Sequence, residues 1–158
     1  MTTKPEQPRR IVARNRRATH DYVILDRIEA GLVLTGTEVK SLRKAEATLA
    51  GSYIRIDDGR CAAWLVGCQI PIYSHGSDAN HEPLRKRKLL LHAREVEKLR
   101  ASLKKDGTTV VPLELLFHGQ WAKIVIALAK GKDKGDKRQS IKAREAKREI
   151  DRAARGRR

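Results

Sequence analysis

The stretch that decides the fold is "TTVVPLELLFHGQWAKIVIALA", which spans residues 108–129. Its first half places Leu113, Leu115 and Phe117 at every second position, and a His-Gly pair at 118–119 separates it from a second apolar run. A period of two is typical of a strand with one buried face, and glycine between two such runs indicates a turn. The stretch therefore predicts a long antiparallel hairpin.

Two other segments also predict strands. Residues 22–34, "YVILDRIEAGLVL", contain two apolar clusters rich in β-branched residues, and Gly31 suggests a bend or bulge between them. Residues 52–66, "SYIRIDDGRCAAWLV", predict a second hairpin whose turn lies at Asp58-Gly59. Hairpins of this kind favour an antiparallel sheet.

Two segments between the strands predict helices. In "TGTEVKSLRKAEA", residues 35–47, Thr35 and Glu38 have the spacing of a capping box, which opens a helix. In "AREVEKLRASLKKDG", residues 93–107, apolar residues recur at three- and four-residue intervals before an Asp-Gly pair. Both segments therefore predict helices that turn one apolar face toward a core.

These elements together predict a mainly β domain of about six antiparallel strands with two or three helices. Our first choice is an OB-like barrel formed by residues 21–131, and our second is an open antiparallel α+β sheet. Residues 1–20 are expected to form a basic flexible arm, and residues 132–158 a basic tail.

The formal net charge of +16 is unevenly distributed along the 158 residues. Residues 1–20 carry six basic residues and one acidic residue, residues 21–128 carry sixteen and thirteen, and residues 129–158 carry thirteen and five. A nearly neutral body thus has a cationic segment at each end. This pattern indicates a polyanionic partner, of which nucleic acid is the best match.

A membrane is a less suitable partner for this chain. No segment predicts an amphipathic helix with a broad apolar face. No apolar run approaches the roughly 20 residues that span a bilayer, and the N-terminus lacks the apolar core of a signal peptide. We therefore expect a soluble, cytoplasmic protein with no membrane partner.

The last 28 residues, "GKDKGDKRQSIKAREAKREIDRAARGRR", hold only two large apolar residues, Ile141 and Ile150. Helix-forming residues dominate, and Glu145 with Arg148 is one of several opposite charges at helical spacing. Such pairs leave an unpacked helix marginal in water. We therefore expect a tail that is disordered when free and helical against an anionic surface, the alternative being a solvated tail that serves solubility alone.

Two short basic clusters allow more than one interpretation. Residues 85–88, "RKRK", suggest an edge strand whose basic row is either a phosphate track or a solvated strand face. Within residues 13–22, "ARNRRATHDY", His20 either contacts a phosphate or caps the fold. The chain has only six aromatic residues. Because a core also needs aromatics, we expect recognition of a folded RNA rather than base stacking along a single strand.

Catalysis is not predicted by any segment. The acidic and histidine residues that come closest to a metal cluster are His75, Asp78, His81 and Glu82, whose spacing matches no strong ligand motif in a loop of turn-forming residues. No glycine-rich phosphate loop, nucleophile elbow or HExxH motif occurs. We therefore expect no enzyme, no metal and no cofactor, and the acid/base pair that a ribonuclease needs is not found.

Several longer motifs resemble one known family. "NRRATHDYVI", "EAGLVLTGTEVKSLR", "SYIRIDDG", "RKRKLLLH", "LAKGK" and "DKRQSIKAREAKREI" occur in the order found in SmpB, the SsrA-binding protein family of bacteria. The resemblance covers Asn15 to Ile150, and the combination of "GTEVKSLR", "RKLLLH" and "AKGK" followed by "DKR" is highly specific.

The resemblance implies an adaptor without an active site of its own. It implies binding to the tRNA-like domain of transfer-messenger RNA (tmRNA, also called SsrA) and delivery, with elongation factor Tu and GTP, to stalled ribosomes. The tail would enter the vacant decoding centre and mRNA channel, so that the nascent chain is tagged and the ribosome rescued by trans-translation. A generic ribosomal or structured-RNA-binding protein is the alternative, and we expect a monomer in either case.

Site residues follow from the resemblance by position. The implied tmRNA contacts are Asn15, Arg16, His20, Glu29, Glu38, Lys40, Arg43, Arg85, Arg87, Lys88, Leu91, Lys130 and Lys132. The implied ribosome contacts in the tail are Gly135, Asp136, Lys137, Arg138, Lys142, Arg144, Lys147 and Arg148. Relatives commonly carry His or Tyr directly before "DKR", where this chain has Gly135. Glycine cannot stack on a base, but it allows a hinge.

Overall fold

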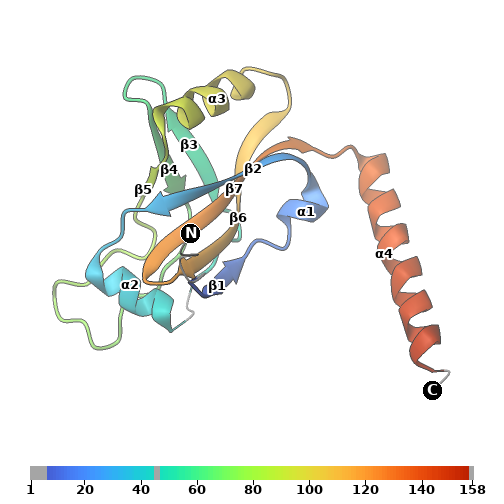
Figure 1. Ribbon diagram of the computed structural model, residues 1–158, viewed down its shortest axis with the longest axis horizontal. Helices are drawn as coiled ribbons and strands as arrows, with labels where there is room; N and C mark the ends of the chain where they lie inside the picture. Colours follow the sequence, from blue (N-terminus) through green and yellow to red (C-terminus); the bar gives the residue numbers. More distant parts are fainter. Residues whose placement is uncertain (1–6, 45–46, 157–158) are drawn as a thin grey trace, which may run out of the picture.

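The computed structural model describes residues 7–44 and 47–156 (Figure 1). Within these residues the strands are β1 (Arg9–Arg14), β2 (Tyr22–Leu32), β3 (Tyr53–Asp57), β4 (Ala62–Val66), β5 (Arg87–Leu90), β6 (Thr108–His118) and β7 (Trp121–Gly131). The helices are α1 (Ala18–Asp21), α2 (Gly36–Arg43), α3 (Ala93–Leu103) and α4 (Lys134–Arg155). Residues 1–6 of the expected arm and residues 157–158 of the expected tail lie outside the described residues.

The strands form one antiparallel sheet in the order β1-β6-β7-β2-β5-β4-β3. The mainly β, antiparallel fold is thus confirmed, but the sheet has seven strands rather than about six and does not close into the OB-like barrel that was our first choice. β3 contacts β6 without joining its ladder, and β1 forms the edge of the sheet beside β6, where it pairs from Arg9↔His118 to Arg14↔Glu114. The sheet is therefore curled but open, and our second choice describes it better. The segment expected as a flexible arm contributes this edge strand.

Both predicted hairpins are present. β6 and β7 pair from Thr108↔Lys130 to His118↔Trp121, and Gly119 in the turn has a φ of 62°, which favours glycine. β3 and β4 pair over their full lengths, from Tyr53 to Asp57 on β3. The long β6–β7 hairpin has a strand on each side, because β1 pairs with β6 and β2 pairs with β7.

β2 is irregular, but not where the sequence suggested. Its bulge lies between Ile24 and Asp26, whereas Gly31 pairs with Lys123 on β7 and with Leu90 on β5. At Gly31 the strand changes partner from β7 to β5. A Cβ atom there would lie 3.2 Å from the Cβ of Leu90, so glycine permits the close approach of the two strands.

The core joins the sheet to two helices. Leu42 of α2 and Leu99 of α3 are both at least 99% buried and pack with inward-facing strand residues such as Leu65 and Ile126. The capping box of α2 is present, and the Thr35 N–H donates to Glu38 Oε2 at 2.9 Å. A smaller cluster that includes Ala18 holds α1 against β6 and β7. α1 therefore packs against the β6–β7 hairpin on the face that points away from the main core.

α4 stands away from the sheet (Figure 1). It comprises 22 residues, all of them described, and none is buried. Its contacts with the body are at its first turns, where it meets α1. Within the described part of the chain, no helix has the length and apolar character needed to cross a membrane.

Candidate nucleic-acid interface

The segment around α1 presents the first group of predicted contacts. The Asn15 side-chain amide donates to the carbonyl of Pro112 at 3.0 Å, and its backbone N–H donates to the carbonyl of Leu113 at 2.8 Å. His20 Nδ1 lies 2.9 Å from Asp21 Oδ1. This hydrogen bond is the main cause that lowers the pKa of the Asp21 carboxyl. The Asn15 amide group is thus occupied in fixing the turn, and the half-exposed His20 ring remains accessible.

Glu29 lies on the outer face of β2 between two cations. Its carboxylate forms an ion pair with Arg9 of β1, and its Oε1 lies 3.2 Å from Lys123 Nζ of β7. The Glu29 side chain is 29% exposed. The carboxylate therefore orients two basic side chains on this face and keeps part of its surface free to accept hydrogen bonds.

A groove of about 280 Å³ opens beside α1. It is lined by Arg14, Asn15, Arg16, Thr19, Arg27, Leu113, Glu114, Val125 and Arg144. Its four arginines come from β1, the following turn, β2 and α4, and Arg14 Nε lies 3.3 Å from the one carboxylate, Glu114. Arginine forks match phosphate oxygens in geometry, so the groove has the charge and donors for an RNA phosphate.

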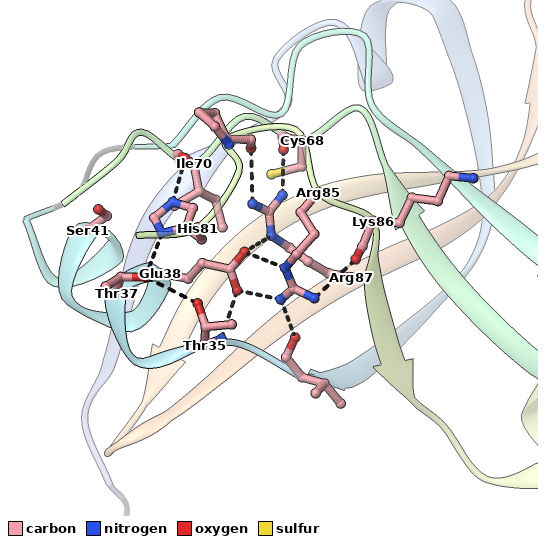
Figure 2. Close-up of polar contacts among 12 residues, drawn as sticks. Thr35, Thr37, Glu38, Ser41, Cys68, Ile70, His81, Arg85, Lys86 and Arg87 are labelled. Carbon is pink, nitrogen blue, oxygen red and sulfur yellow. Dashed lines mark hydrogen bonds and ion pairs between the residues drawn. The ribbon is translucent and has the colours of Figure 1, made fainter. Parts of the chain in front are cut away.

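Glu38 forms the centre of a buried polar network (Figure 2). Its Oε1 accepts from Arg87 Nε at 2.8 Å and from Arg85 Nε at 3.1 Å, and its Oε2 accepts from Arg85 Nη2 at 2.6 Å. Arg87 also donates to the carbonyls of Cys68 at 2.7 Å and Pro83 at 3.0 Å. The network ties α2 and the loop before β5 to β5 itself.

Glu38 and Arg87 are both fully buried, so in this conformation neither of these two predicted RNA contacts is accessible at the surface. Burial alone would raise the pKa of Glu38, but hydrogen bonds from Arg85, the Thr35 N–H and Arg87 outweigh it and lower the pKa to about 2. The buried Glu38 carboxylate is thus negatively charged at neutral pH and is part of the structural framework. In this conformation the two residues hold α2 against β5.

This network is expected to make the protein sensitive to acid. The pKa of Glu38 is lower in the folded protein, about 2, than its ordinary value of 4.5, so its charge stabilises the fold fully above pH 4.5. That contribution, on the order of 3 kcal/mol, is lost as the pH falls from about 4.5 through about 2. Urea unfolding across this range measures it. The free-energy difference between the parent and Glu38→Gln should shrink with falling pH, and a constant difference would contradict the assignment.

The exposed side of α2 carries the other two residues predicted there. Lys40 Nζ lies 5.4 Å from the centre of the Tyr73 ring, and the guanidinium of Arg43 lies 6.0 Å from the centre of the Phe117 ring. Both side chains are exposed, and neither pairs with a carboxylate in the described part of the chain. Lys40 and Arg43 therefore remain available to phosphates.

β5 does not present the basic row that its sequence suggested. It lies between β2 and β4 rather than at an edge, and its side chains alternate, so that Arg87 and Leu89 are buried while Lys88 and Leu90 are exposed. Arg85, whose side chain is 34% exposed, belongs partly to the Glu38 network. Leu91 packs against the core and is only partly accessible. Of the predicted strand contacts, Lys88 is thus the one that points to solvent.

The end of β7 and the start of α4 are held to α1. Lys132 Nζ donates to the carbonyl of Thr19 at 2.9 Å and to Ser140 Oγ at 3.3 Å, and Lys137 Nζ lies 3.7 Å from Asp21 Oδ1. Lys130 is exposed nearby. Gly135 has open space around it, since a Cβ atom there would meet nothing within 4 Å.

The comparisons with known proteins identify the family. The family model described as "SmpB protein" matches residues 12–156. The chain belongs to the SmpB family. It is 54% identical over 147 residues to the SsrA-binding protein of Thermobifida fusca, covering 93% of this chain and 91% of that one. It is 52% identical over 150 residues to the SsrA-binding protein of Bifidobacterium adolescentis, covering 95% and 94%.

A solved structure also resembles this SmpB-family chain. In "tmRNA-SmpB: a journey to the center of the bacterial ribosome", one chain is 43% identical to it and superposes with a TM-score of 0.64. The match covers 82% of this chain and 93% of that chain. The similarity therefore extends to the fold of most of the protein.

The structure of this SmpB-family protein adds residues that the sequence did not single out. Arg9 and Lys123 flank Glu29, and Arg14 and Arg27 border the groove beside α1. Lys123 could have been found from the sequence, because it interrupts the apolar run between Trp121 and Ala129 of β7. Among the described residues, no three His, Cys, Asp or Glu side chains are arranged to hold a metal ion.

Proposed function

We propose that this SmpB-family protein binds the tRNA-like domain of tmRNA and delivers it to stalled ribosomes. The observation that carries the proposal is the groove beside α1, where Arg14, Arg16 and Arg27 of the body lie with a single carboxylate in a chain of this family. Phosphate contacts there would fix the position of a folded RNA. Glu29 on the same sheet would help to align the RNA on the protein, because a carboxylate accepts hydrogen bonds from base amino groups or ribose hydroxyls.

Within this proposal the RNA contacts divide by accessibility. Residues whose side chains reach the surface would touch the RNA directly, namely Asn15, Arg16, His20, Glu29, Lys40, Arg43, Arg85, Lys88, Lys130 and Lys132. Glu38 and Arg87 would act through α2 and β5, and Leu91 through its packing beside them. Elongation factor Tu with GTP would join the complex through the tmRNA. The protein would act as a monomer in the cytoplasm.

The tail would act on the ribosome. α4 spans about 33 Å at 1.5 Å per residue, and all its residues are accessible to a partner. We propose that residues 132–158 are disordered in the isolated protein and helical in the vacant decoding centre and mRNA channel. Their contacts would be made by Gly135, Asp136, Lys137, Arg138, Lys142, Arg144, Lys147 and Arg148. Retained acids at helical spacing support a helix with a defined binding surface.

The RNA recovered with the protein from cells tests the proposal directly. Enrichment of tmRNA over ribosomal and transfer RNA is expected, whereas recovery of many structured RNAs in proportion to their abundance would favour a generic RNA-binding protein. The comparison should be repeated at two salt concentrations, because phosphate contacts alone weaken steeply with salt.

Glu29→Ala is expected to weaken binding of tmRNA by about tenfold, because a charged acceptor of hydrogen bonds is lost. The direction of the change in affinity is informative, because removal of a carboxylate raises the net positive charge of the protein and would strengthen purely electrostatic binding. Glu97→Ala is the matched control, because Glu97 Oε1 pairs with Arg100 at 2.7 Å on α3. Filter binding at moderate salt measures both variants. Equal affinities of Glu29→Ala and the parent would refute the role of Glu29.

A further inference from the structure

The three strands at the far end of the sheet carry a row of outward-facing side chains, of which the proposed function uses only Lys88. Trp64 on β4 pairs in register with Arg55 on β3 and with Lys88 on β5. Directly opposed residues of neighbouring strands project from the same face of a sheet. The Trp64 side chain therefore leaves the sheet between those of Arg55 and Lys88, and both of these basic residues are exposed.

This row borders a shallow hollow. The hollow has a volume of about 280 Å³ and is lined by Arg55, Asp57, Trp64 and Lys86. Lys86 extends away from the buried Glu38 network (Figure 2). Trp64 is partly exposed, so one part of its ring is accessible from solvent.

The cations of this face are not neutralised by the protein. Within the described part of the chain, no carboxylate lies within ion-pair distance of Arg55, Lys86 or Lys88. The Asp57 carboxylate accepts a hydrogen bond from the Gly59 N–H at 3.1 Å and belongs to the β3–β4 turn. Three cations therefore surround one accessible indole, against a single carboxylate that the turn already occupies.

A tryptophan flanked by cations has the chemistry to hold one unpaired nucleotide. An indole face stacks on any base, and adjacent basic side chains contact the phosphates on either side. In a duplex the base faces are covered by their neighbours, so stacking on a side chain requires an unpaired residue. A protein segment is a poorer match, because it would bring no regular negative charge to the three cations.

We propose that the outer face of β3, β4 and β5 binds an unpaired RNA nucleotide, with its base on Trp64 and its phosphates on Arg55, Lys86 and Lys88. The sheet order places this face at the opposite end from β1 and the groove beside α1. On this proposal the protein has two RNA surfaces that share only Lys88, one for a folded RNA and one for an unpaired nucleotide. The second goes beyond the proposed function and does not depend on the identity of the folded RNA.

Tryptophan fluorescence tests this surface, because the chain has two tryptophans. In a Trp121→Phe background Trp64 is the only tryptophan. Titration with an RNA octamer of adenosine is then expected to quench the Trp64 fluorescence in a saturable manner. Trp64→Leu in the parent should lower the octamer affinity, measured by fluorescence anisotropy, by about 5- to 150-fold, whereas Trp64→Phe should retain most of it. Trp121→Leu is the matched control, since Trp121 is 63% exposed elsewhere on the sheet, and should leave the affinity unchanged.

The basic side chains give an independent measurement if Trp64→Leu does not fold. Arg55→Ala with Lys88→Ala should make the plot of log affinity against log salt shallower by about 1.4, the value for two phosphate contacts on a single strand. Absence of quenching, equal quenching by the octamer in a duplex, or an unchanged salt slope would each overturn the proposal. Binding of tmRNA is measured in parallel. Its loss without loss of octamer binding would count against the proposed function alone.

Discussion

Ending the chain after Lys132 is expected to abolish tagging on stalled ribosomes while the affinity for tmRNA falls by less than about fivefold. The body keeps its sheet, because none of the 22 residues of α4 is buried. The small loss of affinity is expected because Arg144 leaves the groove beside α1, where Arg14, Arg16 and Arg27 remain. A single phosphate contact contributes little compared with the whole interface. A binding assay with tmRNA and a reconstituted tagging assay measure the two activities.

A chain that ends after Arg155 is the control for this truncation. It keeps all of α4 and should tag stalled ribosomes nearly as well as the parent. If the truncation after Lys132 reduced RNA binding and tagging equally, the division between body and tail would be refuted. Circular dichroism of the isolated protein adds a direct test of the tail. Little change in helical signal upon truncation is expected if the tail is disordered when free.

Replacing Glu38 by Gln is expected to lower the free energy of unfolding by about 3–5 kcal/mol, because it leaves buried Arg87 without its anion. Glu38 and Arg87 are both fully buried, so water cannot replace the lost partner without rearrangement. The carbonyls of Cys68 and Pro83 still bind Arg87, but they carry no charge. Urea unfolding at neutral pH measures the loss.

Asp26→Asn is the matched control for Glu38→Gln. Asp26 Oδ2 lies 2.6 Å from Lys98 Nζ, but both side chains are at least 40% exposed. An exposed ion pair of this kind contributes no more than about 1 kcal/mol. Equal effects of the two substitutions would show that the buried network does not stabilise the fold more than a surface pair. Each of the two substitutions removes one negative charge, so a difference between their effects reflects the burial of the ion pair and not the change in net charge.

Local features of the fold were predictable, but the way the sheet ends was not. The hairpin at 118–119 and the capping box of α2 depend on residues close together in the chain, and both are present. The edge strand β1 has the sequence "RRIVAR", in which charge conceals strand character. Its pairing with β6 joins residues about 100 positions apart. No local pattern in the sequence indicates such a contact, although it places β1 at the edge of the sheet.

The residues of the candidate site could be predicted only where a charged residue in the sequence is also exposed in the structure. "RKRK" at 85–88 contains four basic residues in succession, yet Arg87 is fully buried while Lys86 and Lys88 are exposed. Strand alternation makes such a split expected, but the choice of which residues face inward needs the register with β2 and β4. A buried arginine also needs a buried anion. Glu38, 49 positions away in the chain, meets that need through tertiary structure alone.

The absence of buried residues in α4 has a consequence for natural variation in the protein. A substitution in the sheet alters folding and binding together, so selection at such a position has two causes that are hard to separate. A substitution in α4 removes no contact from the core, and selection there acts on recognition alone. If the tail binds the ribosome as proposed, positions of α4 that tolerate no change across bacterial lineages would mark its contacts with the ribosome, and freely changing positions would mark residues that make none.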